Sequence, residues 1–96
     1  MKIGYIVCVY EDIKDDTSLK EYAVKAKEAV EKYNGKFLVR GGKKINTEGR
    51  DFVRTAVIEF STFDIAKKFF SSSEYQSAHK LLEGTVIRNH QIIEGT

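Results

Sequence analysis

The sequence predicts an α+β domain in which a four-stranded antiparallel sheet carries helices on one face. Four segments show the apolar alternation of strands, and two longer stretches place apolar residues at helical spacing. Their order is strand, helix, strand, strand, helix, strand, and the two consecutive strands indicate a hairpin. This order is typical of a ferredoxin-like βαββαβ arrangement, with both helices on the same face of the sheet.

Residues 3–10 form the first predicted strand. Both alternating sets of its side chains are apolar, namely Ile3, Tyr5, Val7 and Val9 on one side and Ile6, Cys8 and Tyr10 on the other. A strand that is apolar on both sides is covered on both sides. Because the helices cover only one face, we expect a second copy to cover the other, which gives a homodimer packed sheet to sheet.

The first helix is predicted to begin at Ser18, because Ser18 and Glu21 have the spacing of a capping box. An apolar stripe at helical spacing follows, made of Leu19, Tyr22, Ala23, Ala26, Val30 and Tyr33. The pair Asn34-Gly35 ends the helix, since glycine tolerates the left-handed conformation of a helix cap.

The remaining elements follow from turn and capping residues. Residues 36–40 and 52–60 are predicted as the second and third strands, joined through Gly41-Gly42 and a polar connection. Residues 61–64 carry a capping signature, so a second helix follows, and the serines at 71–73 weaken it. A further helical segment over 74–82 ends at Gly84, and residues 85–94 are the last strand.

Length and charge limit the classes of function. Ninety-six residues fit one domain, spanning residues 1–96. A net charge of +2, with basic and acidic residues interleaved, gives no footprint for nucleic acid or an anionic membrane. No stretch approaches the roughly 20 apolar residues of a membrane span. We therefore expect a cytoplasmic protein without a nucleic-acid or membrane partner.

The residues indicate no metal and no cofactor. The single cysteine, Cys8, excludes a disulfide framework and a thiolate zinc cluster. His79 and His90 alone give an incomplete metal site. Neither a phosphate loop nor a dinucleotide fingerprint is present, and Gly41-Gly42 is only a turn signal.

Charged residues inside otherwise buried strands are the main functional clue. Arg40 and Glu59 lie on the two strands of the predicted hairpin. A buried charge must be paired, exposed at an edge, or in contact with a cavity. One interpretation is a structural ion pair or an arginine that reaches solvent. The other is that Arg40 presents its forked donors to a carboxylate or enolate ligand, with Glu59 orienting it or acting as a base.

Other polar residues are candidates for the same cleft. Ser72 and Tyr75 lie at the helix break, where they either cap and pack or direct both hydroxyls into the mouth of the cleft. Arg88 and His90 alternate onto one face of the last strand. If that face lines the cleft, Arg88 is a candidate ligand-binding residue and His90 a candidate acid–base group. An edge-strand role is the alternative for His90.

Several short motifs follow one another along nearly the whole chain: residues 33–42, Glu48-Gly49, residues 57–60, Ala66 with Phe69 and Phe70, residues 72–76 and residues 92–95. In this order they resemble the family called domain of unknown function 1330. Ser73 replaces the family's usual proline, and Leu82 stands where many members carry arginine. If that arginine binds a ligand in the family, this chain lacks it, and whether Arg88 substitutes for it is open.

The family resembles the dimeric α+β barrel superfamily, which includes cofactor-free monooxygenases, lactone isomerases, haem-degrading enzymes and sensor domains. The resemblance implies a homodimer and a ligand cleft between sheet and helices, but no reaction. We therefore expect a small-molecule-binding homodimer, either a cofactor-independent enzyme, monooxygenase- or isomerase-like, that acts on a small anionic organic compound, or a non-catalytic ligand-sensing or interaction module.

Overall fold

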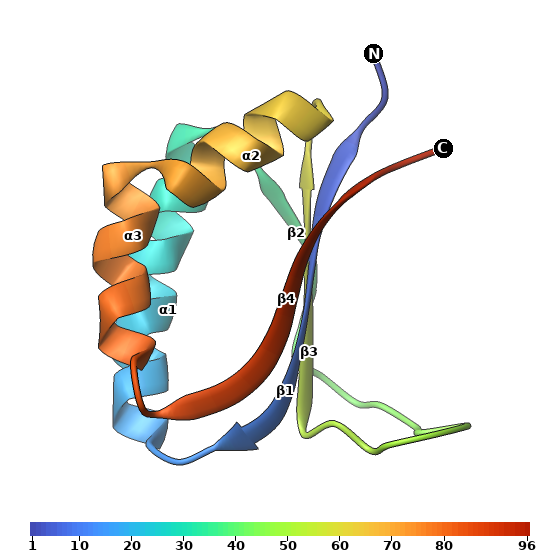
Figure 1. Cartoon of the computed structure of the whole chain (residues 1–96), viewed down its shortest axis with the longest axis vertical. Helices are drawn as coiled ribbons and strands as arrows, with labels where there is room; N and C mark the ends of the chain where they lie inside the picture. Colours follow the sequence, from blue (N-terminus) through green and yellow to red (C-terminus); the bar gives the residue numbers. More distant parts are fainter.

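The computed structural model describes residues 1–96 and has the predicted ferredoxin-like α+β fold. The elements are β1 (Gly4–Ile13), α1 (Asp16–Lys32), β2 (Lys36–Arg40), β3 (Arg54–Phe60), α2 (Phe63–Ser71), α3 (Ser73–His79), a 3₁₀ turn η1 (Lys80–Leu82) and β4 (Val86–Glu94). The strands form one antiparallel sheet in the order β2-β3-β1-β4. All helices lie on one face of this sheet (Figure 1), which confirms the predicted arrangement.

Helix α1 begins earlier than predicted. Its N-cap is Asp15, whose carboxylate accepts hydrogen bonds from the backbone N–H groups of Thr17 and Ser18 at 3.0 and 3.2 Å. The predicted cap, Ser18, instead donates its hydroxyl to Asp15 at 2.9 Å. A charged acceptor satisfies the free N–H groups of the first turn, so the start at Ser18 is wrong.

Helix α1 ends where predicted, but Asn34, and not Gly35, adopts the left-handed conformation. Asn34 has the positive φ of 57°, while Gly35 has none. Gly35 is needed for space, because a Cβ there would lie 2.6 Å from a ring atom of Phe60. Asparagine is among the few residues that adopt the left-handed conformation readily, which explains this difference from the prediction.

The second helical region breaks at Ser72, as predicted. The Thr62 hydroxyl caps α2 by accepting from the Ile65 N–H at 3.1 Å. Ser72 then donates its hydroxyl to the Phe69 carbonyl at 2.6 Å and accepts from the Tyr75 N–H at 3.1 Å. One serine therefore closes α2 and opens α3.

Strand boundaries shift by a few residues from the predicted ranges. β1 continues to Ile13 because Asp12 and Ile13 pair with β4 beyond a bulge. β3 starts at Arg54 rather than at residue 52, and β4 starts at Val86 rather than at residue 85. Boundary residues of this kind are the least constrained by pattern.

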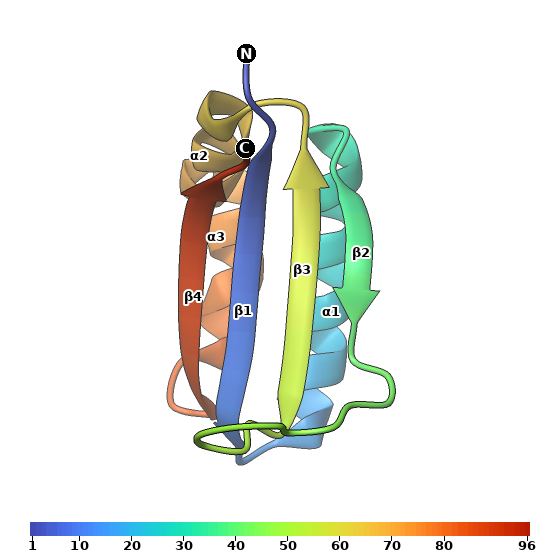
Figure 2. The same cartoon turned by 90° about the vertical axis from the view of Figure 1, so that its right-hand side faces the viewer.

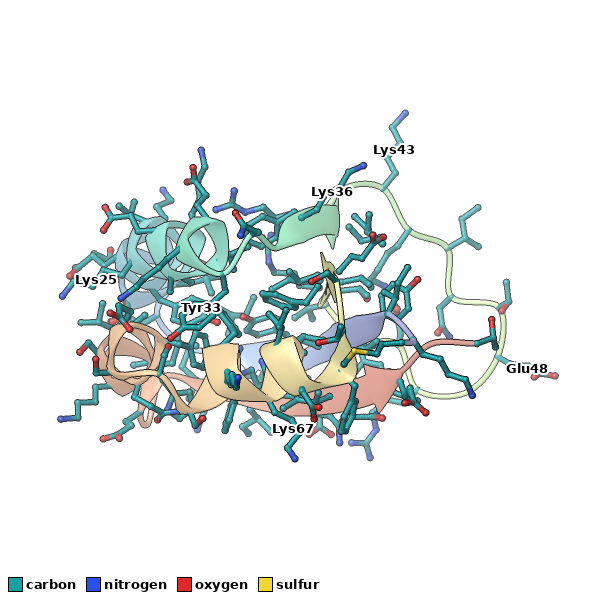
Figure 3. The ribbon with its side chains drawn as sticks, turned by 90° about the horizontal axis from the view of Figure 1, so that it is seen from above. Lys25, Tyr33, Lys36, Lys43, Glu48 and Lys67 are labelled. Carbon is teal, nitrogen blue, oxygen red and sulfur yellow. The ribbon has the colours of Figure 1, made fainter.

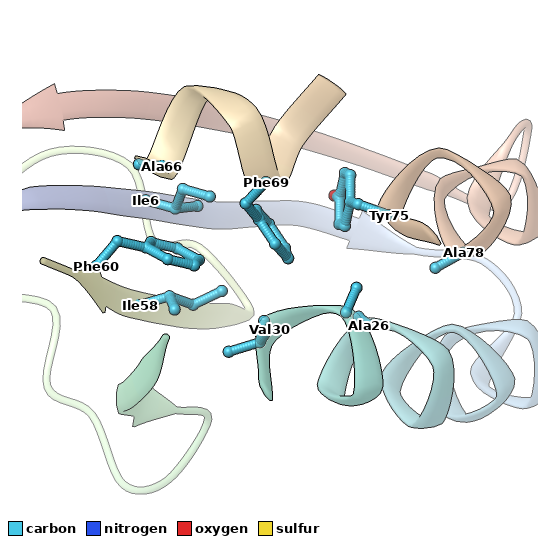
Figure 4. Packing of buried hydrophobic residues seen from close by; sticks show 10 residues of the cluster. Ile6, Ala26, Val30, Ile58, Phe60, Ala66, Phe69, Tyr75 and Ala78 are labelled. Atoms are coloured by element: carbon cyan, nitrogen blue, oxygen red, sulfur yellow. The ribbon is translucent and has the colours of Figure 1, made fainter. Parts of the chain in front are cut away.

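The helices and the sheet enclose a core of ten buried residues (Figure 4). Phe69 from α2 is at its centre, with its ring centroid 4.9 Å from that of Phe60 on β3 and 4.8 Å from that of Tyr75 on α3. Ala26 and Val30 of α1 pack on the same cluster. Aromatic rings therefore join both helical regions to the sheet.

The sheet face away from the helices is called the open face here (Figures 1 and 2). The register places on it Tyr5, Val7, Val9, Lys36, Val39, Thr55, Val57, Glu59, Asn89, Gln91 and Ile93. Val39 and Ile93 are 39% and 47% exposed, so no part of the chain covers them. The loop of residues 41–53, which carries Lys43 and Glu48, extends beyond the sheet on this side (Figure 3).

No helix of the structure is long and apolar enough to cross a membrane.

Candidate functional site

The register groups polar side chains at one end of the helix-covered face. Arg54, Tyr10 and Arg88 form one row across β3, β1 and β4, with Tyr10 in the middle. The next row is Arg40, Ala56, Cys8 and His90. The row after that is wholly apolar, consisting of Phe37, Ile58, Ile6 and Ile92. The covered face therefore changes from cationic to apolar within a few residues.

A cavity of about 50 Å³ lies between this face and the helices. Its lining consists of Ile6, Cys8, Tyr10, Leu19, Tyr22, Ala23, Ala26, Phe37, Arg40, Arg54, Ala56, Ile58, Phe69, Tyr75, Arg88 and His90. Mostly apolar walls with a few convergent polar groups are typical of small-molecule sites.

Arg88 is the centre of the polar end. Its Nη2 donates to the Tyr75 hydroxyl at 2.9 Å, and its Nη1 lies 3.2 Å from the Tyr10 hydroxyl and 3.4 Å from the Tyr22 hydroxyl. Nη1 also lies 3.5 Å from Cys8 Sγ. The guanidinium carbon is 5.6 and 5.4 Å from the ring centroids of Tyr10 and Tyr22. Uncharged groups from two helices and one strand, α1, α3 and β1, thus fix the cation.

Two of the phenols around Arg88, Tyr10 and Tyr75, and the Cys8 thiol are held in their neutral forms. Burial raises the pKa of Tyr10 to about 12 and also raises the pKa of Tyr75. Burial likewise raises the pKa of the Cys8 thiol, against the opposing influence of Arg88. Arginine itself stays protonated at any pH near neutrality. The cluster therefore has a net positive charge and contains no ionised acceptor.

His90 lies beside this cluster on the same face of β4. Its ring centroid is 5.4 Å from that of Phe70 and 6.0 Å from that of Tyr75. Burial, then the charge of Arg88, then His79 lower the pKa of His90 to about 4. At pH 7 the imidazole is neutral, so it adds a possible proton acceptor without adding charge.

Two more arginines lie at the edge of the cavity. Arg40 is exposed, lies over the Phe37 ring at 4.5 Å and donates to the Ala23 carbonyl at 3.4 Å. Arg54 lies against the chain at Gly41, where a Cβ would come within 2.6 Å of its Nη1. Neither forms an ion pair.

No carboxylate lines the cavity. The ion pairs of the protein are Lys32–Glu74, Lys44–Asp51 and Arg50–Glu11, and none includes a cavity arginine. No three His, Cys, Asp or Glu side chains are grouped in the way a metal site requires. Buried cations without a counter-ion are costly unless an anion joins them.

The structure brings together four of the six residues proposed from the sequence: Arg40, Tyr75, Arg88 and His90 all line the cavity. Glu59 does not join them. It pairs with Lys36 on β2 and lies on the open face, whereas Arg40 pairs with Ala56. The hypothesis that Glu59 orients Arg40 or acts as a base beside it is corrected by this register, because side chains alternate between faces.

Ser72 also lies outside the cavity lining. It is 8% exposed, and its hydroxyl is used in the junction between α2 and α3. Of its two interpretations, the geometry agrees with capping. Ser73 is the first residue of α3, and Leu82, in place of the arginine common in the resembling family, is buried at 2% exposure and does not line the cavity.

The sequence reasoning missed Tyr10, Tyr22 and Arg54 as members of the site. The alternation of β1 already placed Tyr10 on the side of Cys8, and the helical stripe already placed Tyr22 inward. A tyrosine on a core-facing position needs a partner for its hydroxyl. This requirement could have identified Tyr10 and Tyr22 as members of a polar cluster. Arg54 gave none, because the start of β3 was not fixed by pattern.

The fold and this cavity define a ferredoxin-like protein with a cationic pocket between sheet and helices. The family described as domain of unknown function (DUF1330) matches residues 3–96, and the chain belongs to it. No curated protein matches the sequence.

Solved structures of other proteins share the fold. A protein of unknown function from Rhodopseudomonas palustris is 10% identical with a TM-score of 0.79, over 99% of this chain and 83% of that chain. A dimeric protein of unknown function with a ferredoxin-like fold from Bacteroides fragilis is 22% identical with a TM-score of 0.56, over 97% and 96%. A cofactor-independent oxygenase from Streptomyces nogalater is 9% identical with a TM-score of 0.65, over 100% and 95%.

Proposed function

We propose that the protein is a homodimer that binds a small anionic organic molecule in the cavity between its sheet and its helices. The observation that carries this proposal is Arg88, a guanidinium held by the hydroxyls of Tyr10, Tyr22 and Tyr75 with no carboxylate near it. An anion bound there would offset the cost of this half-buried, unpaired charge. The apolar remainder of the lining suits the organic part of the molecule.

The open face supports the homodimer. Val57 is at its centre, between Val7 on β1 and Val39 on β2, and these side chains form an apolar strip. Burying such a strip against a second copy is favourable in proportion to the apolar area removed from water. The similar structure from Bacteroides fragilis is described as dimeric, which agrees with this proposal. A cytoplasmic location stays a prediction.

The chemistry available in the cavity favours stabilisation of an oxyanion over proton abstraction. Arg88 and its phenols supply hydrogen-bond donors that are already oriented, which is the arrangement that stabilises a developing enolate. His90 is the one unprotonated base, and its low pKa makes it a weak one at neutral pH. A cofactor-independent enzyme of the monooxygenase or isomerase kind would use the cavity in this way, and the similar oxygenase from Streptomyces nogalater agrees with that possibility.

The second candidate function is a non-catalytic ligand sensor or interaction module. It is favoured by the absence of any carboxylate base in the cavity and by the neutral state of Cys8, Tyr10 and Tyr75. Such a site holds an anion without transforming it. The two candidates share the binding site and differ in whether the bound molecule is recovered unchanged.

Native mass spectrometry of the protein purified from cells tests the shared proposal. We expect a dimer that carries a discrete additional mass, and we expect Arg88→Met to lose that mass while staying dimeric. A monomer at micromolar concentration would contradict the dimer. An additional mass that persists in Arg88→Met would contradict the assignment of the anion site. Incubation of the identified molecule with the protein then separates enzyme from sensor.

A further inference from the structure

We propose that the ligand is a short monocarboxylate whose oxyanion lies at the Arg88 end of the cavity and whose apolar body lies toward Ile6 and Ile58. This inference rests on the proposed function, which assigns the cavity to an anion. It adds the number of charges, the orientation and the approximate size of the molecule. Each follows from a separate observation.

The first observation is a surplus of hydrogen-bond donors. Arg88 donates to the hydroxyls of Tyr10, Tyr22 and Tyr75, so each phenolic oxygen already accepts. Tyr22 and Tyr75 are also 2.9 Å apart, and that contact uses the hydrogen of one of them. The other two phenolic hydrogens have no carboxylate or carbonyl to accept them. The cluster is therefore complementary to an acceptor without donors, which a carboxylate is and an amide or amine is not.

The second observation concerns charge. Arg88 is half-buried, and the two phenols that hold its guanidinium, Tyr10 and Tyr75, are 3% and 1% exposed. Arg40 is exposed and contacts a backbone carbonyl, and Arg54 lies against the chain at Gly41. One inner cation without a counter-ion is matched by one anionic charge. A second negative charge at the far end of the molecule would lie against Ile6 and Ile58, at a large desolvation cost.

The third observation is the change in polarity along the sheet. The cationic row Arg54–Tyr10–Arg88 is separated from the apolar row containing Ile58 and Ile6 by the single row of Ala56 and Cys8. A cavity of about 50 Å³ holds about four water-sized groups. The molecule that spans both rows is therefore a short-chain acid, with its chain directed away from Arg88.

Titration of the ¹⁵N-labelled protein with four probes tests this inference. The probes are butyrate, its neutral analogue butyramide, the dianion succinate, and inorganic phosphate. We expect butyrate to shift the amide resonances of residues around Cys8 and Arg88 in a saturable way. We expect butyramide to bind at least ten times more weakly, because it lacks the charge and brings donors to a site that already has too many.

Three variants sharpen the test. Arg88→Met should abolish saturable butyrate shifts, and Tyr10→Phe should raise the Kd for butyrate about tenfold, which is the usual effect of losing one hydrogen bond to a charged group. Tyr33→Phe is the matched control, because this phenol packs on Phe69 outside the cavity lining. Its Kd should equal that of the wild type. The spectrum of each variant also reports whether it is folded.

The outcomes separate this inference from the proposed function. Tighter binding of succinate or phosphate, lost in Arg88→Met, would keep the anion site and overturn the monocarboxylate. Equal binding of butyrate and butyramide would overturn the donor argument. No saturable shift with any of the three anions would overturn both. A shift with butyrate that is unchanged in Tyr10→Phe would remove Tyr10 from the site and contradict the proposed geometry.

Discussion

The hydroxyl of Tyr75 on α3 lies 2.9 Å from Nη2 of Arg88 on β4 and accepts a hydrogen bond from it. This contact joins the helical layer to the sheet at the polar end of the cavity. Tyr75 is 1% exposed, and its ring packs on Phe69 at 4.8 Å. Its apolar body therefore belongs to the core while its polar end belongs to the site.

Replacing Arg88 with methionine should not destabilise the ligand-free protein. The substitution removes a half-buried charge that no carboxylate pairs and keeps most of the side-chain volume, and the hydroxyls of Tyr22 and Tyr75 keep their contact with each other. We expect the free energy of unfolding to stay within about 1 kcal/mol of the wild-type value, or to rise. Urea denaturation followed by circular dichroism measures it. A loss of about 3 kcal/mol would mean that Arg88 is a structural residue and not one kept for a ligand.

His90 should make the protein less stable as the pH falls below neutrality. Its pKa is about 4 in the folded state, mainly because of burial, and near 6.5 when unfolded. Between these two pH values the unfolded chain binds more protons than the folded protein. The free energy of unfolding therefore decreases as the pH is lowered, by at most about 3 kcal/mol from this residue.

The variant His90→Gln separates this contribution from those of other groups. Denaturation at pH 7 and at pH 4.5 should show a smaller loss of stability in His90→Gln than in the wild type. Tyr33→Phe is the control, because Tyr33 packs on Phe69 outside the cavity lining and the variant keeps both histidines. If wild type and His90→Gln lose the same stability, the histidine is not held neutral by its surroundings.

Gly41 and Gly42 provide a matched pair for the role of Arg54. Both have positive φ, 72° and 92°, so alanine at either position should cost about 1 kcal/mol of stability through the backbone. Only at Gly41 would the new Cβ meet a side chain, at 2.6 Å from Arg54 Nη1. We therefore expect Gly41→Ala, and not Gly42→Ala, to weaken the binding of anions in the titration described above. Equal affinities in the two variants would show that the position of Arg54 is unimportant.

The open face should control assembly. Val57→Glu introduces a charge at the centre of the apolar strip, between Val7 and Val39, and should convert the dimer to a monomer by burying an unpaired carboxylate. Val24→Glu is the control, since Val24 is on α1, away from that face, and is 62% exposed. Sedimentation velocity at micromolar concentration measures both. A dimer that persists in Val57→Glu would show that the subunits associate through another surface.

The fold was predictable because its signals are local and repeated. The alternation in β1 and the stripe on α1 each extend over many residues, so single exceptions do not obscure them. The predicted start of α1 was wrong because two residues that can cap a helix, Asp15 and Ser18, lie within one turn. The sequence pattern does not show which of the two is the cap. The position of the turn after α1 was predicted, but the residue in the left-handed conformation is Asn34 and not Gly35.

The site was less predictable, because it depends on register across strands that are distant in sequence. Arg88 and Tyr10 are neighbours only through the pairing of β1 with β4, and Arg40 is separated from Glu59 only through the pairing of β2 with β3. A shift of one residue in either pairing would exchange the faces. Composition carries no information about such a shift, so Arg40 and Arg88 could be proposed from the sequence while Tyr10 and Arg54 were missed.

The alternation of β1 has a mechanical consequence. Ile6, Cys8 and Tyr10 face the cavity, and the residues between them, Val7 and Val9, face the other way. One strand, β1, therefore contributes both to the cavity and to the open face, so a shift of its backbone moves both sets of side chains. Val9 and Tyr10 are joined by one peptide bond, so a displacement of the backbone at Val9 would also move the Tyr10 hydroxyl relative to Arg88. A partner bound to the open face at Val7 or Val9 therefore lies one residue along the chain from Cys8 and Tyr10, which line the cavity.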